Sequence, residues 1–334
     1  MKTRILTAAI LSALAFPIAA HAAATRTHVS NAGSDANATF SCDYANPCRT
    51  FAAALAVTTP GGEILAIDSS GYGKVVIDRS VSIIAAPGVF AGIGVGSGNG
   101  VTIATAGVNV VLRGLTINNM GSSGDGIHMD AGDSLVVQNC VIANFAVSSS
   151  SGLFVAGTMR VRLLDSLLQG NYIGASFSGG PKVLVSGSRF LDSGTHGLYA
   201  SATGAGVVTR VEVIRSEASG NVNVGFYPTA SDSARAELNL KDSVASRNSN
   251  GVNALASGGT ALARVSNSLI SGNTSYGLRG AGSGAKLVAA GNRVTDNGIG
   301  LFQTASGVLQ STGDNTLSDN GLATSGTITS LPNM

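Results

Sequence analysis

The sequence contains no tryptophan, only three cysteines and few charged or aromatic residues. Charged residues make up 11% of its 334 residues, and aromatic residues 5%. Because 20 Lys and Arg face 18 Asp and Glu, no excess of one sign attracts nucleic acid or an anionic membrane. We therefore expect no nucleic-acid partner. Glycine occurs 45 times, but 44% of the residues are hydrophobic, which favours a packed structure over disorder.

The first 22 residues have the pattern of an export signal. Lys2 and Arg4 form a basic start, an apolar stretch runs from Ile5 to Ile18, and Ala20-His21-Ala22 supplies small residues for a signal peptidase. We predict cleavage after Ala22 and a secreted or periplasmic protein. The apolar run is short for a bilayer, so we expect no membrane insertion; an N-terminal membrane anchor is the alternative. The remaining chain is then neutral, with 18 basic and 18 acidic residues.

The three cysteines divide into a close pair and a single residue. Cys42 and Cys48 lie six positions apart in a polar segment, which predicts a disulfide in an oxidising compartment. A zinc site would need a second pair of ligands, which the spacing lacks. Cys140 falls in a column of interior positions described below, and we expect it to be buried and chemically inert.

The strongest signal is a repeat of 22 to 28 residues that extends from residue 115 to residue 320. Its first column holds Leu115, Cys140, Ser166, Ser188, Ser216, Ser243, Ser268, Asn292 and Asn315. The residue two positions after each of these is always apolar. Asparagine stands five positions after six of them, as Asn171, Asn221, Asn248, Asn273, Asn297 and Asn320. A glycine with an apolar successor follows, as Gly126, Gly152, Gly174, Gly197, Gly225, Gly251, Gly277 and Gly300.

This repeat predicts an all-β, single-stranded right-handed parallel β-helix. Each repeat reads as short alternating strands between Gly, Ser and Asn turns, and stacking lets each strand pair with its equivalent in the next coil. We expect the asparagines to adopt left-handed turn conformations and their amides to bond along the stack. A leucine-rich repeat would need a leucine framework and a helical return segment, and a left-handed β-helix would need a six-residue rhythm. Neither pattern is present.

The segment before the repeats reads as a cap for the first coil. We assign residues 23–62 to this cap, with a short helix over Pro47–Ala56, residues 63–321 to the β-helix and residues 322–334 to a C-terminal tail. An uncapped first coil would expose apolar surface and unpaired backbone groups. At the usual spacing between strands, the predicted stack is roughly 50 Å long.

Two segments near the start carry a resemblance to a known group. His28–Asp35 (HVSNAGSD) and Asn46–Leu55 (NPCRTFAAAL), together with the coils that follow, are similar to secreted bacterial right-handed β-helix repeat proteins of the pectin-lyase-like superfamily. The resemblance covers nearly the whole chain after the leader. It implies the β-helix fold and, as possible activities, those of polysaccharide lyases, glycoside hydrolases, epimerases, adhesins or phage tailspikes. It is specific for fold and weak for function.

The catalytic sets of those enzymes are missing here. Polygalacturonase-type enzymes resemble one another in an Asn-Thr-Asp motif, an Asp-Asp pair, a Gly-His-Gly and an Arg-x-Lys, none of which occurs in the sequence. The best local candidate is Asp125, His128 and Asp130, with Asp133 close behind, because a carboxylate beside an imidazole suits acid–base chemistry. The alternative is that these are solvated turn residues, which we favour. Asp192 and His196 form a second, weaker candidate.

An aromatic column offers a candidate binding surface. The position two after each repeat glycine should point outward, and it reads His128, Phe154, Ser176, Tyr199, Tyr227, Asn253, Arg279 and Phe302. Phe154, Tyr199, Tyr227 and Phe302 could stack on sugar rings in a long, shallow groove. The alternative is that the rings stack on one another, and the lack of tryptophan favours this alternative.

These observations predict a secreted, non-catalytic β-helix that serves as a surface scaffold or binds an extended ligand such as a polysaccharide or cell-surface glycan. The alternative is a polysaccharide lyase, hydrolase or epimerase, in which Arg279 or Arg113 would supply a cation. Arg279 should lie roughly 29 Å from His128, six strands along the stack, which counts against it. A third hypothesis is an adhesin-like passenger. We predict no cofactor and no metal site, with calcium relevant only to a lyase, and the oligomeric state stays open.

Overall fold

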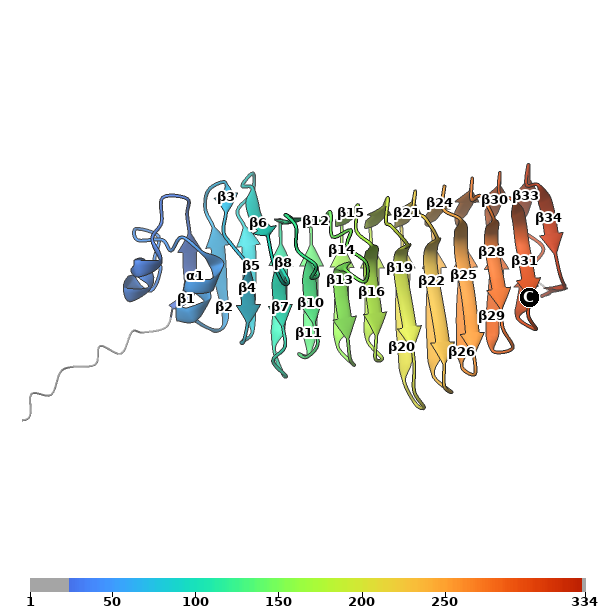
Figure 1. Ribbon diagram of the computed structural model, residues 1–334, viewed down its shortest axis with the longest axis horizontal. Coiled ribbons are helices and arrows are strands. Elements are labelled where there is room, and N and C mark those ends of the chain that lie inside the picture. The colour runs from blue at the N-terminus through green and yellow to red at the C-terminus, as the bar shows by residue number, and fades with distance from the viewer. Residues whose placement is uncertain (1–23, 332–334) are drawn as a thin grey trace, which may run out of the picture.

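The computed structural model describes residues 24–331 as an elongated stack of parallel β-coils (Figure 1). The predicted leader, residues 1–22, and the last three residues of the predicted tail lie outside the described residues. Three parallel sheets run along the stack, and each coil contributes one strand to each sheet in turn. We call the sheets A, B and C in the order in which a coil visits them. The fold prediction of a parallel β-helix is confirmed.

Sheet A has 13 strands and sheets B and C have 11 each. Sheet A comprises β1 (Ala24–Val29), β2 (Thr58–Ala66), β5 (Val81–Ala85), β8 (Asn109–Arg113), β11 (Ser134–Gln138), β14 (Arg160–Leu164), β17 (Lys182–Ser186), β20 (Val208–Ile214), β23 (Arg235–Lys241), β26 (Thr260–Ser266), β29 (Ala285–Ala290), β32 (Val308–Ser311) and β35 (Ile328–Ser330). Sheet B comprises β3 (Ser70–Gly71), β6 (Ala91–Val95), β9 (Leu115–Asn119), β12 (Val141–Ala143), β15 (Leu167–Gln169), β18 (Arg189–Leu191), β21 (Glu217–Ser219), β24 (Val244–Ser246), β27 (Leu269–Ser271), β30 (Arg293–Thr295) and β33 (Thr316–Ser318). Sheet C comprises β4 (Val75–Ile77), β7 (Val101–Ile103), β10 (Ile127–Met129), β13 (Ser151–Ala156), β16 (Ile173–Ser178), β19 (His196–Ala202), β22 (Val224–Ser231), β25 (Asn250–Ser257), β28 (Tyr276–Ala281), β31 (Ile299–Thr304) and β34 (Leu322–Ser325).

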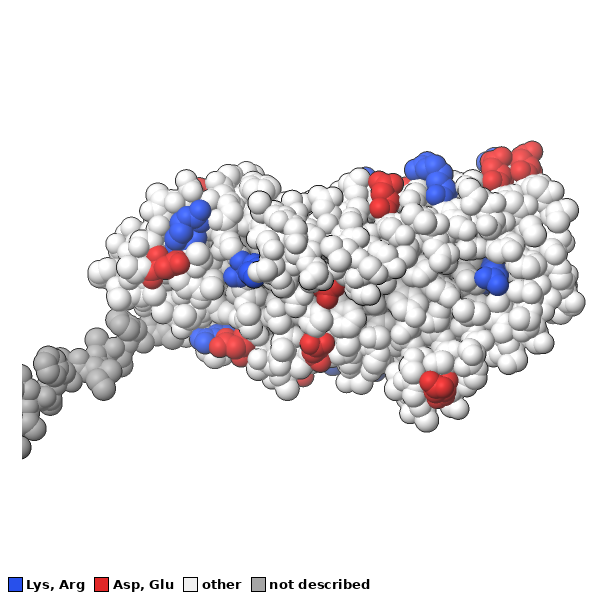
Figure 2. Space-filling model, in the orientation of Figure 1, with Lys and Arg blue, Asp and Glu red and all other residues white. Residues whose placement is uncertain are grey.

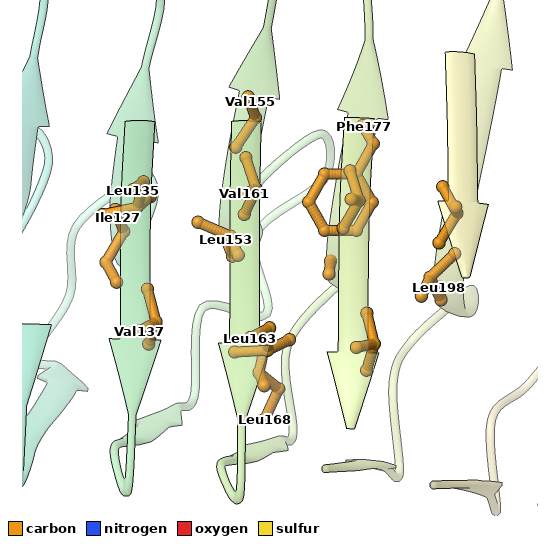
Figure 3. Close-up of a cluster of buried hydrophobic side chains, with 14 of the residues drawn as sticks. Ile127, Leu135, Val137, Leu153, Val155, Val161, Leu163, Leu168, Phe177 and Leu198 are labelled. Atoms are coloured by element: carbon orange, nitrogen blue, oxygen red, sulfur yellow. The ribbon is translucent and has the colours of Figure 1, made fainter. Parts of the chain in front are cut away.

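The core is a continuous column of apolar side chains between the three sheets (Figure 3). Alternate residues of each strand point inward, and the parallel register stacks like on like, as where Ile127 pairs with Leu153. Both of these side chains are fully buried. Because each coil hides its apolar face only against its neighbours, the stack as a whole forms one core.

Two ladders of polar side chains run along the stack at the turns on either side of sheet B. In the first, the Cys140 N–H donates to Ser166 Oγ at 3.1 Å and the Ser166 N–H donates to Ser188 Oγ at 3.2 Å. The same contact recurs down to Asn315. In the second, the Asn248 N–H and Nδ2 donate to Oδ1 of Asn273, each at 3.1 Å. The predicted bonding between asparagine amides along the stack is therefore present.

The predicted left-handed conformation of these asparagines is wrong. Positive φ angles belong instead to the residues directly before them, among them Gly220 at 70°, Arg247 at 54° and Asp296 at 57°. The left-handed residue turns the chain at the corner, and the residue after it then points its side chain into the coil, where the amide can bond. The tight bend and the inward amide are thus supplied by two neighbouring residues.

The N-terminal segment packs a short helix over the first coils (Figure 1). A 3₁₀ helix, η1 (Asp35–Phe40), precedes α1 (Phe51–Val57), whose Phe51, Ala54 and Leu55 are buried. The predicted helical start at Pro47 is wrong, because Oδ1 of Asp35 accepts the N–H groups of Arg49 and Thr50 and holds them outside the helix. Within residues 24–331, no helix is long and apolar enough to cross a membrane.

The stack extends beyond both predicted boundaries. β1 lies in the segment assigned to the cap, yet it pairs with β2 as the first strand of sheet A. At the other end, β34 and β35 lie in the segment assigned to the tail and pair with β31 and β32. Thirteen strands at the usual spacing make sheet A roughly 58 Å long, somewhat more than predicted. Cys42 and Cys48 form a disulfide, with their Cα atoms 5.0 Å apart, and Cys140 is a buried free thiol.

Candidate functional site

The predicted outward column lies on the outer face of sheet C, one residue per strand. The strand register aligns His128 with Phe154, Ser176 with Tyr199, and Tyr199 with Tyr227. Further along the sheet it aligns Asn253 with Arg279 and then with Phe302. The expectation that every member faces solvent is wrong at two positions, because Ser176 is 6% exposed and Asn253 is 3% exposed. The aromatic members are only partly exposed, so their neighbours cover much of each ring.

The rings of this face contact one another in three groups. His128 stacks on Phe154 with ring centroids 4.7 Å apart, and Tyr276 stacks on Phe302 at 4.4 Å. Arg279 lies over both rings of the second pair. The third group is formed by three rings, His196, Tyr199 and Tyr227. Mutual stacking, the alternative to sugar binding that the sequence left open, is thus present, and it covers the ring faces that point along the stack.

Tyr276 was missed by the sequence reasoning, although it is part of this surface. Its register position, directly before a repeat glycine, aligns it with Asn250 on one side and Ile299 on the other. His196 occupies the same row on β19. The signal for both residues was the row one position before the glycines, which projects to the same face as the row two positions after the glycines. Only the second row was read as a surface.

A shallow pocket of about 250 Å³ opens beside the third group of rings. Its walls combine aromatic, small apolar and hydroxyl side chains, and it is lined by Tyr199, Ala202, Thr203, Tyr227, Thr229, Ala230, Ser231, Leu255 and Ser257. The Thr229 hydroxyl donates to the Tyr199 hydroxyl at 3.2 Å, which fixes one polar edge of the pocket. The pocket is small and lacks charged lining residues, so its chemistry suits a ligand with hydroxyl groups and apolar faces.

Four polar side-chain atoms of this face have no hydrogen-bond partner within the described residues. They are Nδ1 of His196, Oδ1 of Asn250, Oδ1 of Asn253 and Nε of Arg279. All four atoms are buried, so a ligand at the surface does not reach them while the neighbouring side chains stay in place. Burial lowers the pKa of His196 to about 4, so its ring is neutral at pH 7 and can accept or donate a hydrogen bond. The outer face of sheet C also carries few charged side chains (Figure 2).

Asp125, His128 and Asp130 converge, as the enzyme hypothesis required. His128 Nδ1 lies 2.6 Å from Oδ2 of Asp125, and Nε2 lies 2.8 Å from Oδ2 of Asp130. Asp125 is 8% exposed, and its other oxygen accepts the Ser151 N–H at 2.6 Å, which ties it to the next coil. Burial lowers the pKa of His128, but hydrogen bonds and charge attraction from the two carboxylates outweigh burial and raise the pKa above its ordinary value.

The imidazole of this cluster is not a free base, and neither candidate cation lies beside it. Both ring nitrogens of His128 are engaged by carboxylates, so neither is available to take a proton from a substrate. The structure places Arg113 on sheet A, and the strand order places Arg279 six strands from His128, so neither candidate cation belongs to the cluster. Asp192 and His196 do not form a unit either, because Asp192 accepts from Gln169 Nε2 while His196 packs against the tyrosines. In residues 24–331, no three His, Cys, Asp or Glu side chains are grouped to hold a metal ion.

Comparison with known proteins supports the fold. The family described as "Right handed beta helix region" matches residues 99–264. Among solved structures, that of pectate lyase Pel9A is similar, with a TM-score of 0.52 and 14% sequence identity over 90% of this chain and 78% of that chain. At this identity the similarity concerns the fold alone. A search among curated protein sequences gave no match.

Proposed function

We propose that this chain, a right-handed parallel β-helix of the pectin-lyase-like superfamily, is a non-catalytic module that binds a polysaccharide along the outer face of sheet C. The pocket beside Tyr199 and Tyr227 carries this proposal, because aromatic rings and side-chain hydroxyl groups meet there on one face. Sugars offer hydroxyl groups for such hydrogen-bonding side chains and apolar ring faces for aromatic side chains. The pocket beside Tyr199 and Tyr227 marks the place where one sugar unit would insert most deeply.

The geometry supports edge contact rather than full stacking. Neighbouring rings cover each other's faces along the stack, so a glycan would meet ring edges and the pocket floor. Such contacts contribute less than a full aromatic platform, and we expect moderate affinity that grows with the number of sugar units. The export signal predicted in residues 1–22 supports a location outside the cytoplasm, where a cell-surface or matrix glycan would be the partner.

A binding screen of the protein against neutral and acidic polysaccharides tests this proposal. We expect Tyr199→Ala with Tyr227→Ala to abolish retention on the glycan that binds. Tyr44→Ala is the matched control, because it removes an exposed aromatic ring in the N-terminal segment, outside sheet C, and it should leave retention unchanged. If the double variant retains the glycan as well as the unchanged protein, the pocket is not the binding site.

An enzyme of the polysaccharide lyase, hydrolase or epimerase classes is the second candidate. The convergence of Asp125 and Asp130 on His128 favours it, while the occupied ring nitrogens oppose it. The same screen distinguishes the two, if it follows unsaturated and reducing ends with and without calcium. We expect neither kind of end to form. Cleavage that disappears in His128→Ala would establish an enzyme and make the two aspartates the next residues to replace.

A further inference from the structure

A cleft lies between α1 and the first strands of sheet C, at the capped end of the stack. It has a volume of about 540 Å³, and pockets that hold small ligands measure about 300 to 1,000 Å³. Ala52, Leu55 and Ala56 of α1 line one side, and residues of β4 and β7 line the other. In the strand order, β4 lies five strands from the strand of Tyr199, so this cleft, which we call the cap cleft, is separate from the pocket beside the tyrosines.

The walls of the cap cleft are apolar where they are exposed. α1 has the sequence FAAALAV, without a polar side chain, and a helix that is apolar all round is normally buried on every side. Ala52 and Ala56 are nevertheless exposed, and their spacing of four residues places them on one face of α1. On β4, Val76 is 68% exposed at an outward position, where a polar residue is usual. Three apolar side chains are thus left uncovered around one cleft.

The cap cleft has one positive charge that no carboxylate balances. Arg79 and Asp78 form an ion pair, with Nε 2.8 Å from Oδ1, so their charges cancel. Within residues 24–331, no ion pair engages Lys74. Its Nζ donates only to Ser97, to the carbonyl oxygen at 2.6 Å and to Oγ at 3.3 Å. The lining residues Lys74, Arg79 and Asp78 together leave a net charge of +1 beside the apolar walls.

The uncharged polar side chains of the cap cleft already bond within the protein. Oδ1 of Asn99 accepts the N–H of Asp125 at 2.9 Å, and its Nδ2 donates to Oγ1 of Thr102 at 3.5 Å. None of the described residues that line the cleft is aromatic, so a sugar ring or a nucleic-acid base finds no ring to stack on. A ligand with many hydroxyl groups therefore fits this cleft poorly. A ligand with one anionic group and an apolar body fits what remains.

We propose that the cap cleft binds a free medium-chain alkyl carboxylate. The carboxylate pairs with the ammonium group of Lys74 through a charge-assisted hydrogen bond. The alkyl chain covers Ala52, Ala56 and Val76 and so removes their exposed apolar surface from water. Each methylene group that leaves water should raise the affinity about fourfold, so the length of the chain matters as much as its charge.

Isothermal titration calorimetry with octanoate, octanol and octylamine tests both parts of the proposal. We expect octanoate to bind most tightly, because octanol lacks the charge and Lys74 repels octylamine. Hexanoate, which is two methylene groups shorter, should bind on the order of tenfold more weakly than octanoate. Octanol that binds as tightly as octanoate would overturn the proposal, and so would an absence of octanoate binding.

Two variants separate the charge from the apolar wall. Lys74→Gln should lower the affinity for octanoate about fivefold and leave the affinity for octanol unchanged. Val76→Asp should weaken both ligands, and octanoate more than octanol, because it removes an apolar contact and adds a like charge. The matched control is Lys286→Gln, which removes an exposed cation on β29 in sheet A and should change neither affinity. Because all three replaced side chains are exposed, we expect circular dichroism to show a retained fold.

The variants also supply results that contradict the proposal. An equal loss of octanoate affinity in Lys74→Gln and Lys286→Gln would show general charge attraction instead of a site. Octanoate affinity that is unchanged in Val76→Asp would place the ligand elsewhere. This inference does not rest on the sheet C proposal, since Tyr199→Ala with Tyr227→Ala should leave octanoate binding intact. Failure of either proposal is therefore distinguishable from failure of the other.

Discussion

The Nδ1 atom of His128 lies 2.6 Å from Oδ2 of Asp125, and the same aspartate accepts the backbone N–H of Ser151 in the next coil through its other oxygen. The histidine is thereby joined to two coils of sheet C and is also stacked on Phe154. These contacts make the cluster a structural link between coils, and its protonation state becomes a determinant of stability.

The first prediction concerns the pH dependence that His128 adds to stability. Its pKa is raised in the folded protein above the ordinary value of 6.5, so protonation favours the folded state. The stabilisation is fully present below about pH 6.5 and is lost as the pH rises through the folded-state pKa. We expect the thermal midpoint of the unchanged protein to exceed that of His128→Gln most at low pH. The difference should shrink as the pH rises from about 6.5 through the folded-state pKa of His128.

His196 provides an internal contrast for this measurement. Its pKa is lowered to about 4, so its contribution is present above pH 6.5 and is lost as the pH falls toward 4. His196→Gln should therefore change the acid side of the stability profile and leave the alkaline side alone. A profile that is identical in the two variants would contradict the assignment of both pKa shifts.

The second prediction concerns the asparagine ladder. Asn248 is 1% exposed; its amide nitrogen donates to Ala218 O and Asn273 Oδ1, and its oxygen accepts from Asn221. Asn248→Ala leaves several buried groups without partners, and we expect a loss of about 3 kcal/mol in the free energy of unfolding. Chemical denaturation measures it, and Asn239→Ala, on the exposed face of sheet A, is the control. A loss no larger than that of the control would show that the ladder is not stabilising.

The third prediction concerns the column of repeat glycines. A Cβ atom on Gly251 would lie 2.7 Å from the carbonyl oxygen of Gly277 in the next coil and 2.8 Å from Ile270 Cγ2. Because the backbone of the neighbouring coil cannot move aside without breaking its pairing, we expect Gly251→Ala to cost about 1 to 3 kcal/mol. Gly96→Ala is the control, since its Cβ would meet open space. Equal stability of the two variants would show that adjacent coils can separate locally.

The fourth prediction concerns three exposed cations, Arg160, Lys182 and Arg210, that lie next to one another on the outer face of sheet A. Lys182 lies between Arg160 and Arg210 in the register, so its removal relieves repulsion on both sides. We expect Lys182→Gln to raise the free energy of unfolding by about 0.2 to 1 kcal/mol at low salt. The gain should disappear in high salt because exposed charges are screened. A loss of stability in low salt would show that this lysine has a structural partner.

The pattern of side chains in the sequence determined the coil and its interior. The column from Leu115 to Asn315 and the apolar residues two positions later are almost all buried, because a strand exposes alternate residues to the core. Alternation also placed His128 and Asp130 on one face. The outward column of sheet C was predicted for the same reason, although the burial of Ser176 and Asn253 was not.

Only the tertiary structure decided what these side chains contact. Mutual stacking of the rings, the unpaired buried atoms of His196 and Asn253, and the contact of Arg160 with Lys182 on the next strand all depend on which coil lies next to which. Coils of unequal length align residues at different sequence separations, such as 22 for Arg160 with Lys182 and 28 for Lys182 with Arg210, and a fixed period does not give those pairs. The local sequence sets the direction in which a side chain points, whereas the stacking of coils sets its neighbour, and the proposed binding chemistry of this protein depends on the neighbours.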